Sequence, residues 1–448
     1  MKKIAIVILI VFFTFGIFAE EKEIAVIYDR PTTLTYPSIN HTPFGIHKGT
    51  PFWLKVFLGN RTYFNDPQDL AATKLLVDKD RAPYQLTVYG VNSGNSEIIY
   101  NPTMYTLAIF GKYGSGDGEL NKPVGITCNE YGDIYIADTG NNRISRWYND
   151  GKKVRFIRNI GGYGENPGEF KNPRYVALDS LGRVYVSDTG NNRIQVFDKS
   201  GGFLYMIDKT KGISNPQGIA VSDSSERYSG YRYDYIYLID GNYNRIQKFD
   251  FNGNLVRAIR VDNSLNKEVK ITTLEQDYYG NVYVVDNKNS CIHKFTPDLY
   301  YITSFGKYGT DDYEFDHPTG IAIYKYFGQV FISERESAQY FWICSDALNF
   351  KAKKMEGDDI LFEFFLTEKS FITIEIEDAS TDSSMTRKIT IFDKITLEIG
   401  KNSIAWSIPE EYRNFLKENK YYNAVLTVMS TYSSYPHIKK VIKTLLFM

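Results

Sequence analysis

The stretch Asp138-Thr139-Gly140-Asn141-Asn142-Arg143-Ile144 recurs without change at residues 188–194. Weaker copies surround these two, and the six copies begin at residues 92, 138, 188, 240, 286 and 334. Successive copies are 46 to 52 residues apart. A repeat of this length indicates a radial or stacked array of equivalent units rather than one continuous core.

One repeat unit predicts four short strands. In the second full copy, runs rich in β-branched and aromatic residues alternate with turns rich in Gly, Asn and Asp. These runs cover residues 175–179, 184–188, 193–197 and 203–207. Four antiparallel strands per unit, repeated six times in a closed ring, leave no open sheet edge. The sequence therefore predicts an all-β chain built on a six-bladed β-propeller.

The repeats resemble those of the NHL-repeat propellers. The resemblance rests on short phrases in two units, at residues 123–126, 132–138, 142–144, 172–173, 182–188 and 192–197. It is specific over residues 105–345 and weaker over 52–104. It implies a six-bladed NHL-type fold. Some similar propellers are lyases or lactonases that hold a metal in the central channel, and many NHL propellers bind RNA through a basic face.

Residues 1–19 have the pattern of a secretory signal peptide. Lys2 and Lys3 precede an apolar segment at residues 4–18, and Ala19 offers a cleavage point. The apolar segment is short for a membrane span, although an uncleaved anchor is the alternative. We expect an extracytoplasmic protein, periplasmic or secreted, with no stable membrane span.

The ends of the propeller are predicted from a segment at its start that has the pattern of a single blade strand. Residues 20–51 hold four prolines and no periodicity, which predicts an irregular lead-in. Residues 52–58 have the composition of a fourth strand without the first three, so we expect them to close the last blade. The alternative donor is the segment 349–353. On this interpretation the propeller covers residues 52–354.

The periodicity stops near residue 355, and residues 356–448 predict a second domain. Six or seven short alternating strands in this length favour a β-sandwich. The segment resembles the immunoglobulin-like domain of exported bacterial proteins such as flagellar hook-cap proteins. A capping-box pattern at 407–410 additionally predicts a short helix over residues 409–420.

The repeated phrase places an Asp and an Arg opposite one another across a hairpin. The pairs are Asp138/Arg143, Asp188/Arg193 and Asp240/Arg245. One interpretation is an ion pair that fixes the turn. The other is a ring of arginines offered to an anionic ligand. The copies at 92, 286 and 334 lack this pair, and we expect no clamp in those blades.

The long connections between blades suggest a binding face. Three of them carry a tyrosine soon after a glycine, and the residue after each proline is expected at the channel mouth. Aromatic residues and arginine together are typical of binding hot spots. The alternative is that each tyrosine packs on its own loop. The candidate ligand-binding residues are Tyr113, Arg143, Tyr163, Arg174, Arg193, Gln217, Arg245, Tyr308 and Thr319.

Catalytic motifs are not evident in the sequence. Of the five histidines, only His293 and His317 lie within the propeller. Two histidines are fewer than the three protein ligands usual for catalytic zinc. A net charge of −1 disfavours nucleic acid as a partner. The three cysteines lie in different repeats and predict buried free thiols. We expect no catalytic residue, no metal and no cofactor.

These observations favour one function over two others. We expect an exported, monomeric, non-catalytic binding or scaffold protein that presents its propeller face to a protein or glycan partner in the cell envelope. The first alternative is a metal-dependent propeller enzyme, lyase- or lactonase-like, that acts on a small substrate. The second is a purely structural component of the envelope.

Overall fold

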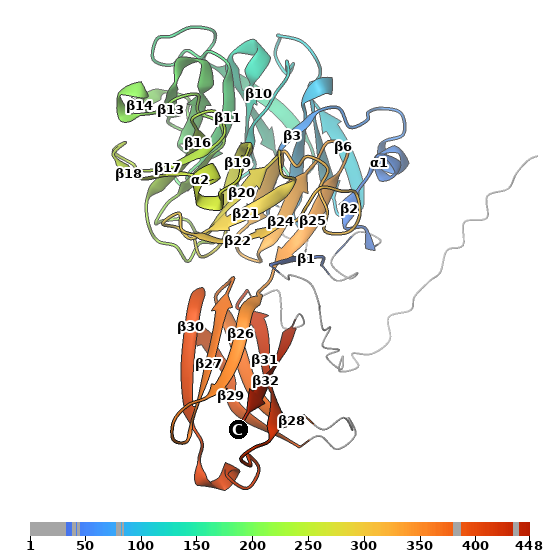
Figure 1. Cartoon of the computed structure of the whole chain (residues 1–448). Coiled ribbons are helices and arrows are strands. Elements are labelled where there is room, and N and C mark those ends of the chain that lie inside the picture. Colours follow the sequence, from blue (N-terminus) through green and yellow to red (C-terminus); the bar gives the residue numbers. More distant parts are fainter. Residues whose placement is uncertain are drawn as a thin grey trace, which may run out of the picture.

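The structure is a computed structural model that describes residues 33–37, 42, 45–77, 82, 85–379, 387–432 and 439–448. The expected signal peptide and most of an insertion at 78–84 lie outside these residues. The described chain forms a β-propeller with a smaller β-sandwich attached to one of its faces (Figure 1). No helix among the described residues has the length and apolar character needed to span a membrane.

The propeller predicted from the repeats is confirmed. Within the described residues, six antiparallel sheets follow one another in chain order, and the first strand of each contacts the first strand of the next. The first strand of the sixth sheet, β23, contacts β3 of the first sheet and so closes the ring. Blades one to three consist of β3 (Pro67–Thr73), β4 (Thr87–Asn92), β5 (Glu97–Thr103) and β6 (Thr106–Phe110); β7 (Ile126–Cys128), β8 (Asp133–Asp138), β9 (Arg143–Asn149) and β10 (Val154–Ile160); and β11 (Pro173–Leu178), β12 (Val184–Asp188), β13 (Arg193–Phe197) and β14 (Phe203–Ile207).

The remaining blades repeat the same order with more variation. Helix α2 (Val261–Leu265) follows the last strand of blade four. Blades four to six consist of β15 (Ile219–Ser222), β16 (Tyr235–Asp240), β17 (Arg245–Asp250) and β18 (Leu255–Arg260); β19 (Ile271–Gln276), β20 (Val282–Asp286), β21 (Cys291–Phe295) and β22 (Tyr301–Phe305); and β23 (Gly320–Tyr324), β24 (Gln329–Ser333) and β25 (Ala338–Ile343).

Blade six is closed by the N-terminal part of the chain, but not by the segment that the sequence predicted. Strands β1 (Leu34–Thr35) and β2 (Lys48–Gly49) pair with β25. Residues 52–58, predicted as the closing strand, lie instead in helix α1 (Pro51–Leu58). Pro51 at the first turn favours a helix start, and the buried residues Leu54 and Leu58 are one turn apart. The lead-in therefore contains the strands that seal the ring.

Two sheets form the C-terminal sandwich around one hydrophobic core. The predicted boundary at residue 356 is wrong, because β26 pairs with β27 and so belongs to the sandwich. The predicted helix over 409–420 is reduced to a 3₁₀ turn (Glu410–Tyr412), since the Ser407 hydroxyl donates to Asp359 instead of capping a helix. The strands are β26 (Ala347–Lys354), β27 (Asp359–Leu366) and β30 (Gly400–Ser407) in one sheet, and β29 (Lys388–Leu397), β28 (Ser370–Asp378), β31 (Tyr421–Ser430) and β32 (Lys440–Phe447) in the other.

A buried polar cluster joins the two domains. The Lys294 ammonium of blade five donates to the Glu368 carboxylate and, at 2.8 Å, to the Thr367 carbonyl of the sandwich. Tyr432 of the sandwich packs against the rings of Tyr278 and Tyr279. Tyr278 and Tyr279 lie in the turn between the first and second strands of blade five, and Lys294 lies in the third strand of the same blade. The sandwich therefore docks on part of the propeller face that carries these turns, which we call the hairpin face.

Candidate functional site

The opposite face, here called the loop face, carries the repeated phrase and the connections between blades. In a four-stranded antiparallel blade, the turn between strands two and three lies at the same end as the link from strand four to the next blade. The first residue of each copy is a side-chain acceptor at this end. It accepts a hydrogen bond from the backbone N–H of the loop that enters the same blade. The pairs are Asn92–Asn65 (2.7 Å), Asp138–Asn121 (2.7 Å), Asp188–Lys171 (2.8 Å), Asp240–Ser214 (3.0 Å), Asp286–Lys270 (3.1 Å) and Glu334–Asp316 (2.7 Å).

Other residues of the phrase reach into the next blade. Asn142 adopts a left-handed backbone conformation with φ of 52°, which asparagine tolerates, and its side-chain oxygen accepts from the Asn172 N–H at 2.8 Å. The Thr139 hydroxyl donates to the Pro173 carbonyl at 2.7 Å. Thr189 donates to Pro216 in the same way in the following blade. The phrase is thus a joint between neighbouring blades.

The arginines of the phrase are engaged by the protein itself. Arg193 donates to the Asp188 carboxylate at 2.7 Å and to the carbonyls of Glu165, Asn166 and Glu169 at 2.7 to 2.9 Å. Arg143 makes the equivalent four contacts in blade two. Arg245 holds both Asp240 carboxylate oxygens and the Gly212 carbonyl. This geometry supports the structural interpretation of the Asp–Arg pairs.

The blades predicted to lack a clamp have a different one. In blade one, Glu97 accepts from Asn92 and from Thr62. In blade six, the Gln339 amide donates to the Glu334 carboxylate at 2.6 Å and to the Glu314 carbonyl at 2.7 Å. In blade five the arginine position is Cys291, and His293, two residues later, contacts the Asp286 carboxylate at 3.1 Å. The first residue of the phrase therefore accepts from the incoming loop in all six blades, while its side-chain partner changes, and in blade one Asn92 donates to that partner.

Three tyrosines predicted for the binding face stand out from their loops. Tyr113, Tyr163 and Tyr308 are 74%, 72% and 67% exposed. Each loop is closed by a hydrogen bond across its base and by one buried hydrophobic side chain. The closing bonds are Gly114 N–H to Leu120 O, Gly164 N–H to Phe170 O and Gly309 N–H to Phe315 O, at 3.0 to 3.2 Å. The rings are thus presented on stiff, repeated supports rather than packed on their own loops.

A fourth tyrosine on this face was missed by the sequence analysis. Tyr63 is 64% exposed and lies in the connection from blade six to blade one. Its carbonyl accepts from the Asn92 and Asn95 amides, which anchors the loop. A partial signal was present, since Asn65-Asp66-Pro67 resembles the Asn-Lys-Pro at 121–123, but Tyr63 lies four residues before its proline and the other three tyrosines lie ten before theirs. The sequence analysis did not recognise the loop, because it expected a strand where helix α1 lies. We call Tyr63, Tyr113, Tyr163 and Tyr308 the tyrosine arc, because they mark four consecutive blade junctions.

The other residues predicted for the face differ in accessibility. Arg174 and Thr319 are half-buried. Gln217 is 1% exposed and Arg193 is 6% exposed, so neither is accessible on the surface. His317 lies beside the arc, with its ring 5.5 Å from that of Tyr308 and its Nδ1 2.6 Å from Asp316. Whether this face binds a partner stays a prediction.

A second candidate site lies in the central channel, towards the hairpin face. A cavity of about 530 Å³ is lined by the first strands of all six blades. Burial raises the pKa of Asp69 to about 8, although the backbone N–H groups of Ile126 and Leu70 oppose the shift. Desolvation also raises the pKa of Glu275, while the nearby charge of Lys325 lowers it. The channel thus holds carboxyl groups suited to proton transfer.

The insertion at 222–234, predicted as an exposed loop, partly covers the channel. Asp223 accepts from the Ser180 N–H at 2.6 Å. Glu226 pairs with Lys325 of blade six at 2.7 Å, and the Tyr228 ring contacts that of Tyr326. The segment is a loop with exposed residues such as Tyr233, as the sequence predicted, but part of it is held against the propeller by these contacts.

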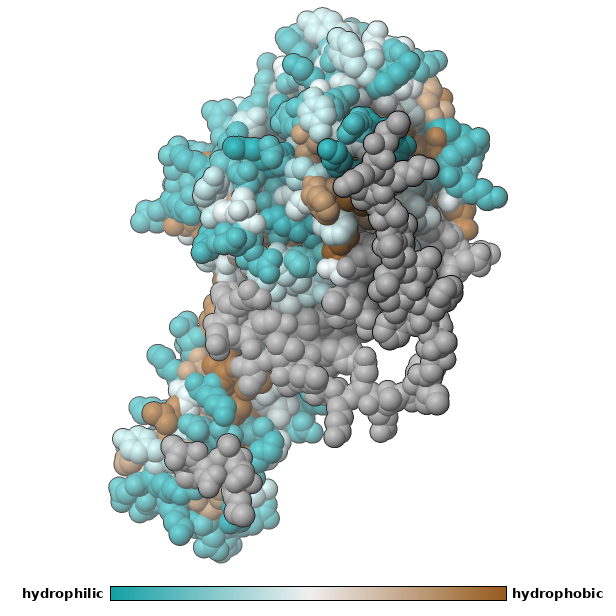
Figure 2. Space-filling model, turned by 90° about the vertical axis from the view of Figure 1, so that its right-hand side faces the viewer, coloured by the Kyte–Doolittle hydropathy of each residue, from teal (hydrophilic) through white to brown (hydrophobic). Residues whose placement is uncertain are grey.

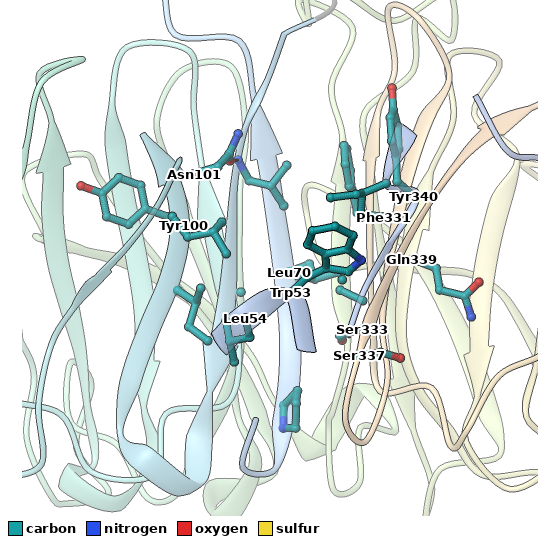
Figure 3. A pocket seen from close by; sticks show the side chains of 18 of the residues that line it. Trp53, Leu54, Leu70, Tyr100, Asn101, Phe331, Ser333, Ser337, Gln339 and Tyr340 are labelled. Carbon is teal, nitrogen blue, oxygen red and sulfur yellow. Dashed lines mark hydrogen bonds between the residues drawn. The ribbon is translucent and has the colours of Figure 1, made fainter. Parts of the chain in front are cut away.

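A third cavity lies at the junction of blades one and six. It has a volume of about 290 Å³ and is mostly apolar, and Trp53 and Leu54 of α1 line it together with Phe331 and Tyr340 (Figure 3). Among the described residues, clusters of buried hydrophobic side chains fill each of the other five junctions. On the side seen in Figure 2, hydrophilic residues dominate the propeller and brown, hydrophobic ones form only small patches.

Metal-ligating side chains converge at one place among the described residues. Asp286, Cys291 and His293 lie in blade five, away from the channel. All three cysteines are free thiols, as the sequence predicted, but only Cys291 and Cys344 are buried and Cys128 is half-buried.

Comparisons with known proteins agree with this architecture. Residues 120–147 and 170–197 match the family model of the NHL repeat. The protein lin-41 of Caenorhabditis elegans is 50% identical over 42 residues, a match that spans 9% of this chain and 4% of that protein.

Solved structures with a similar shape have low sequence identity to this chain. A virginiamycin B lyase from Staphylococcus aureus is 15% identical, with 57% of this chain and 76% of the lyase covered at a TM-score of 0.41. A gluconolactonase from Xanthomonas campestris is 12% identical, with 71% and 97% covered and a TM-score of 0.46. PorZ, a surface component of the type-IX secretion system of Porphyromonas gingivalis, is 9% identical, with 85% and 51% covered and a TM-score of 0.43. These similarities concern shape and carry no statement about function.

Proposed function

We propose that this chain is an exported, non-catalytic binding protein that presents the tyrosine arc to a protein or glycan partner in the cell envelope. The observation that carries the proposal is the exposure of four tyrosines at consecutive blade junctions, three of them on loops closed by the same backbone hydrogen bond. Tyrosine supplies a large amphipathic contact surface and loses little conformational entropy on binding. The sandwich docks on the hairpin face and leaves the arc open to a partner.

Further features belong to the same proposal. Export rests on the signal-like pattern of residues 1–19. We infer a monomeric six-bladed NHL-type ring, since β1 and β2 cover part of the outer strand β25 of the last blade. The sandwich is proposed as an immunoglobulin-like spacer that positions the propeller.

Substitution of the arc tests the proposal against a matched control. The variant with Tyr63, Tyr113, Tyr163 and Tyr308 replaced by Ser is compared with one carrying Tyr131→Ser and Tyr233→Ser. The control tyrosines are 58% and 59% exposed and lie in hairpin-face turns. Envelope extract and a glycan array are used to identify a partner of the unaltered chain, and its affinity for each variant is then measured.

We expect the arc variant to bind at least about 30-fold more weakly, because hot-spot residues contribute about 2 kcal/mol or more each. The control should bind normally, and both variants should keep the original melting curve because the replaced side chains are exposed. The double variant with Tyr163→Ala and Arg174→Ala should also lose binding. Unchanged affinity of the arc variant for the partner would place the binding site elsewhere.

The channel favours a second candidate, an enzyme that acts on a small substrate. A carboxyl group with a pKa near 8, such as Asp69, is protonated at neutral pH and can act as a general acid. A panel of lactones and esters, assayed with and without added divalent metals, tests this candidate. Turnover that Asp69→Asn and Glu275→Gln abolish, and that the arc variant retains, would establish the enzyme and contradict the non-catalytic proposal.

A further inference from the structure

Blade five lacks the arginine that blades three and four place beside a buried carboxylate. Asp286 is 0% exposed, as are Asp188 and Asp240, each of which faces an arginine. The position of that arginine is Cys291 in blade five, and His293 follows two residues later. A buried carboxylate requires compensation by hydrogen bonds or a cation.

Three potential ligand atoms meet at one point. His293 Nε2 lies 3.1 Å from Asp286 Oδ2 and 3.7 Å from Cys291 Sγ. All three ligand atoms lie within 4.8 Å of one another, and all three side chains are buried. A catalytic triad would use different imidazole nitrogens for the cysteine and the carboxylate. Here both face the same nitrogen, which is the arrangement of ligands around a shared ion.

The other nitrogen of the imidazole is held from behind. His293 Nδ1 lies 2.7 Å from Ser304 Oγ, which in turn lies 2.8 Å from the Tyr301 hydroxyl. Metal-binding histidines characteristically have such a partner, which fixes the ring and its tautomer. This contact leaves Nε2 directed at Asp286 and Cys291.

We propose that Asp286, Cys291 and His293 form a binding site for a zinc-class divalent ion, which takes the place of the clamp arginine in blade five. Around a tetrahedral zinc, N–O and N–S ligand separations are roughly 3.4 and 3.6 Å. The observed separations of 3.1 and 3.7 Å need only small adjustments. An O, N and S donor set suits zinc.

Binding also balances in protons. The thiol gives up its proton and becomes a thiolate ligand, and the imidazole binds through Nε2 as the tautomer that carries its proton on Nδ1. That proton is donated to Ser304 Oγ. One proton leaves per ion, and the fourth coordination position takes a water. The ion would join β20 and β21 as Arg193 joins β12 and β13. This role is independent of the tyrosine arc.

The test uses tag-free, full-length chain treated with a chelator and titrated with Co²⁺, followed by competition with Zn²⁺. We expect one ion per chain and a thiolate-to-cobalt charge-transfer absorption band. Zinc should abolish the band and protect one thiol from alkylation. Cys291→Ser should remove the band, His293→Gln should remove saturable binding, and Ser304→Ala should weaken binding about 10-fold.

Matched controls distinguish this site from adventitious binding. Cys344→Ser and His317→Gln should bind cobalt as the unaltered chain does. Circular dichroism and the melting curve establish that each variant is folded, and a ligand variant that fails to fold is replaced by Asp286→Asn. Cobalt binding without a thiolate band, or equal binding by folded Cys291→Ser and the unaltered chain, would overturn the proposal.

Discussion

Blades three and five build the same joint with different chemistry. In blade three, Arg193 links Asp188 to three carbonyls of the incoming loop. In blade five, Asp286 keeps its hydrogen bonds from the backbone N–H groups of Lys270, Lys288 and Asn289, but faces His293 in place of a guanidinium. The part that the blades share is the acceptor side chain. The residues that face this acceptor differ between blades. A blade can therefore change its chemistry at these positions without losing the joint.

The largest effect should come from breaking the joint of blade three. Arg193→Ala leaves the Asp188 carboxylate buried without its cation and three carbonyls without a donor. We expect a loss of about 3–5 kcal/mol in the free energy of unfolding, measured by urea denaturation. Lys199→Ala, at an exposed position in the same blade, should change stability by less than about 0.5 kcal/mol. Equal losses in the two variants would refute the role assigned to Arg193.

A smaller effect is expected at the most accessible arginine of the series. The Arg245 side chain is 28% exposed, against 7% for Arg193, and it holds one carbonyl rather than three. Water can therefore reach Asp240 when the arginine is removed. Arg245→Ala should cost about 1–3 kcal/mol in the same assay. A loss greater than that of Arg193→Ala would show that burial does not set the order.

The pH dependence of blade five follows from Asp286. Burial raises the pKa of this carboxyl, but hydrogen bonds from His293, Asn289 and the Lys270 N–H outweigh burial. The pKa of Asp286 therefore lies below its usual value. Its contribution is therefore fully present above the unfolded-state pKa of about 3.9, and is lost as the pH falls through the lower folded-state pKa. In chelator, the stability difference between the unaltered chain and Asp286→Asn should shrink below about pH 4. A difference that stays constant down to pH 2 would contradict this assignment.

The smallest effect on stability should accompany His293→Gln. Gln195 holds the equivalent position in blade three and donates to Asp188 at 3.0 Å, so a glutamine can serve the joint. In chelator, the variant should lose less than about 1 kcal/mol. With zinc added, the melting temperature of the unaltered chain should rise and that of the variant should not, since zinc stabilises the folded state only of a protein that binds it. A zinc-dependent rise in the melting temperature of both proteins would show that His293 is not needed for stabilisation by zinc.

Much of the binding face was accessible to sequence reasoning because it is local. A glycine, a tyrosine and a proline at fixed offsets recur in three of the loops, and these three loops fold alike. The structure shows that Gln217 and Arg193 are buried and so inaccessible to a partner. Sequence reasoning did not predict this, because their burial depends on packing between blades. It added Tyr63, which follows a helix that no repeat contains. The ligand set of blade five was also written in the sequence, as Asp, Cys and His within eight residues, but counting histidines alone passed over it.

The sequence by itself determined the repeating β-hairpins, the ring of blades and the pairing of Asp with Arg, because these depend on strand alternation and on turns of a few residues. The tertiary structure alone decided which segment closes the ring, where the sandwich begins and docks, and which side chains remain exposed. These depend on pairings between distant residues, such as Leu34 with Ile343 and Lys294 with Glu368. Their free energy comes from burial and partners that no local pattern encodes.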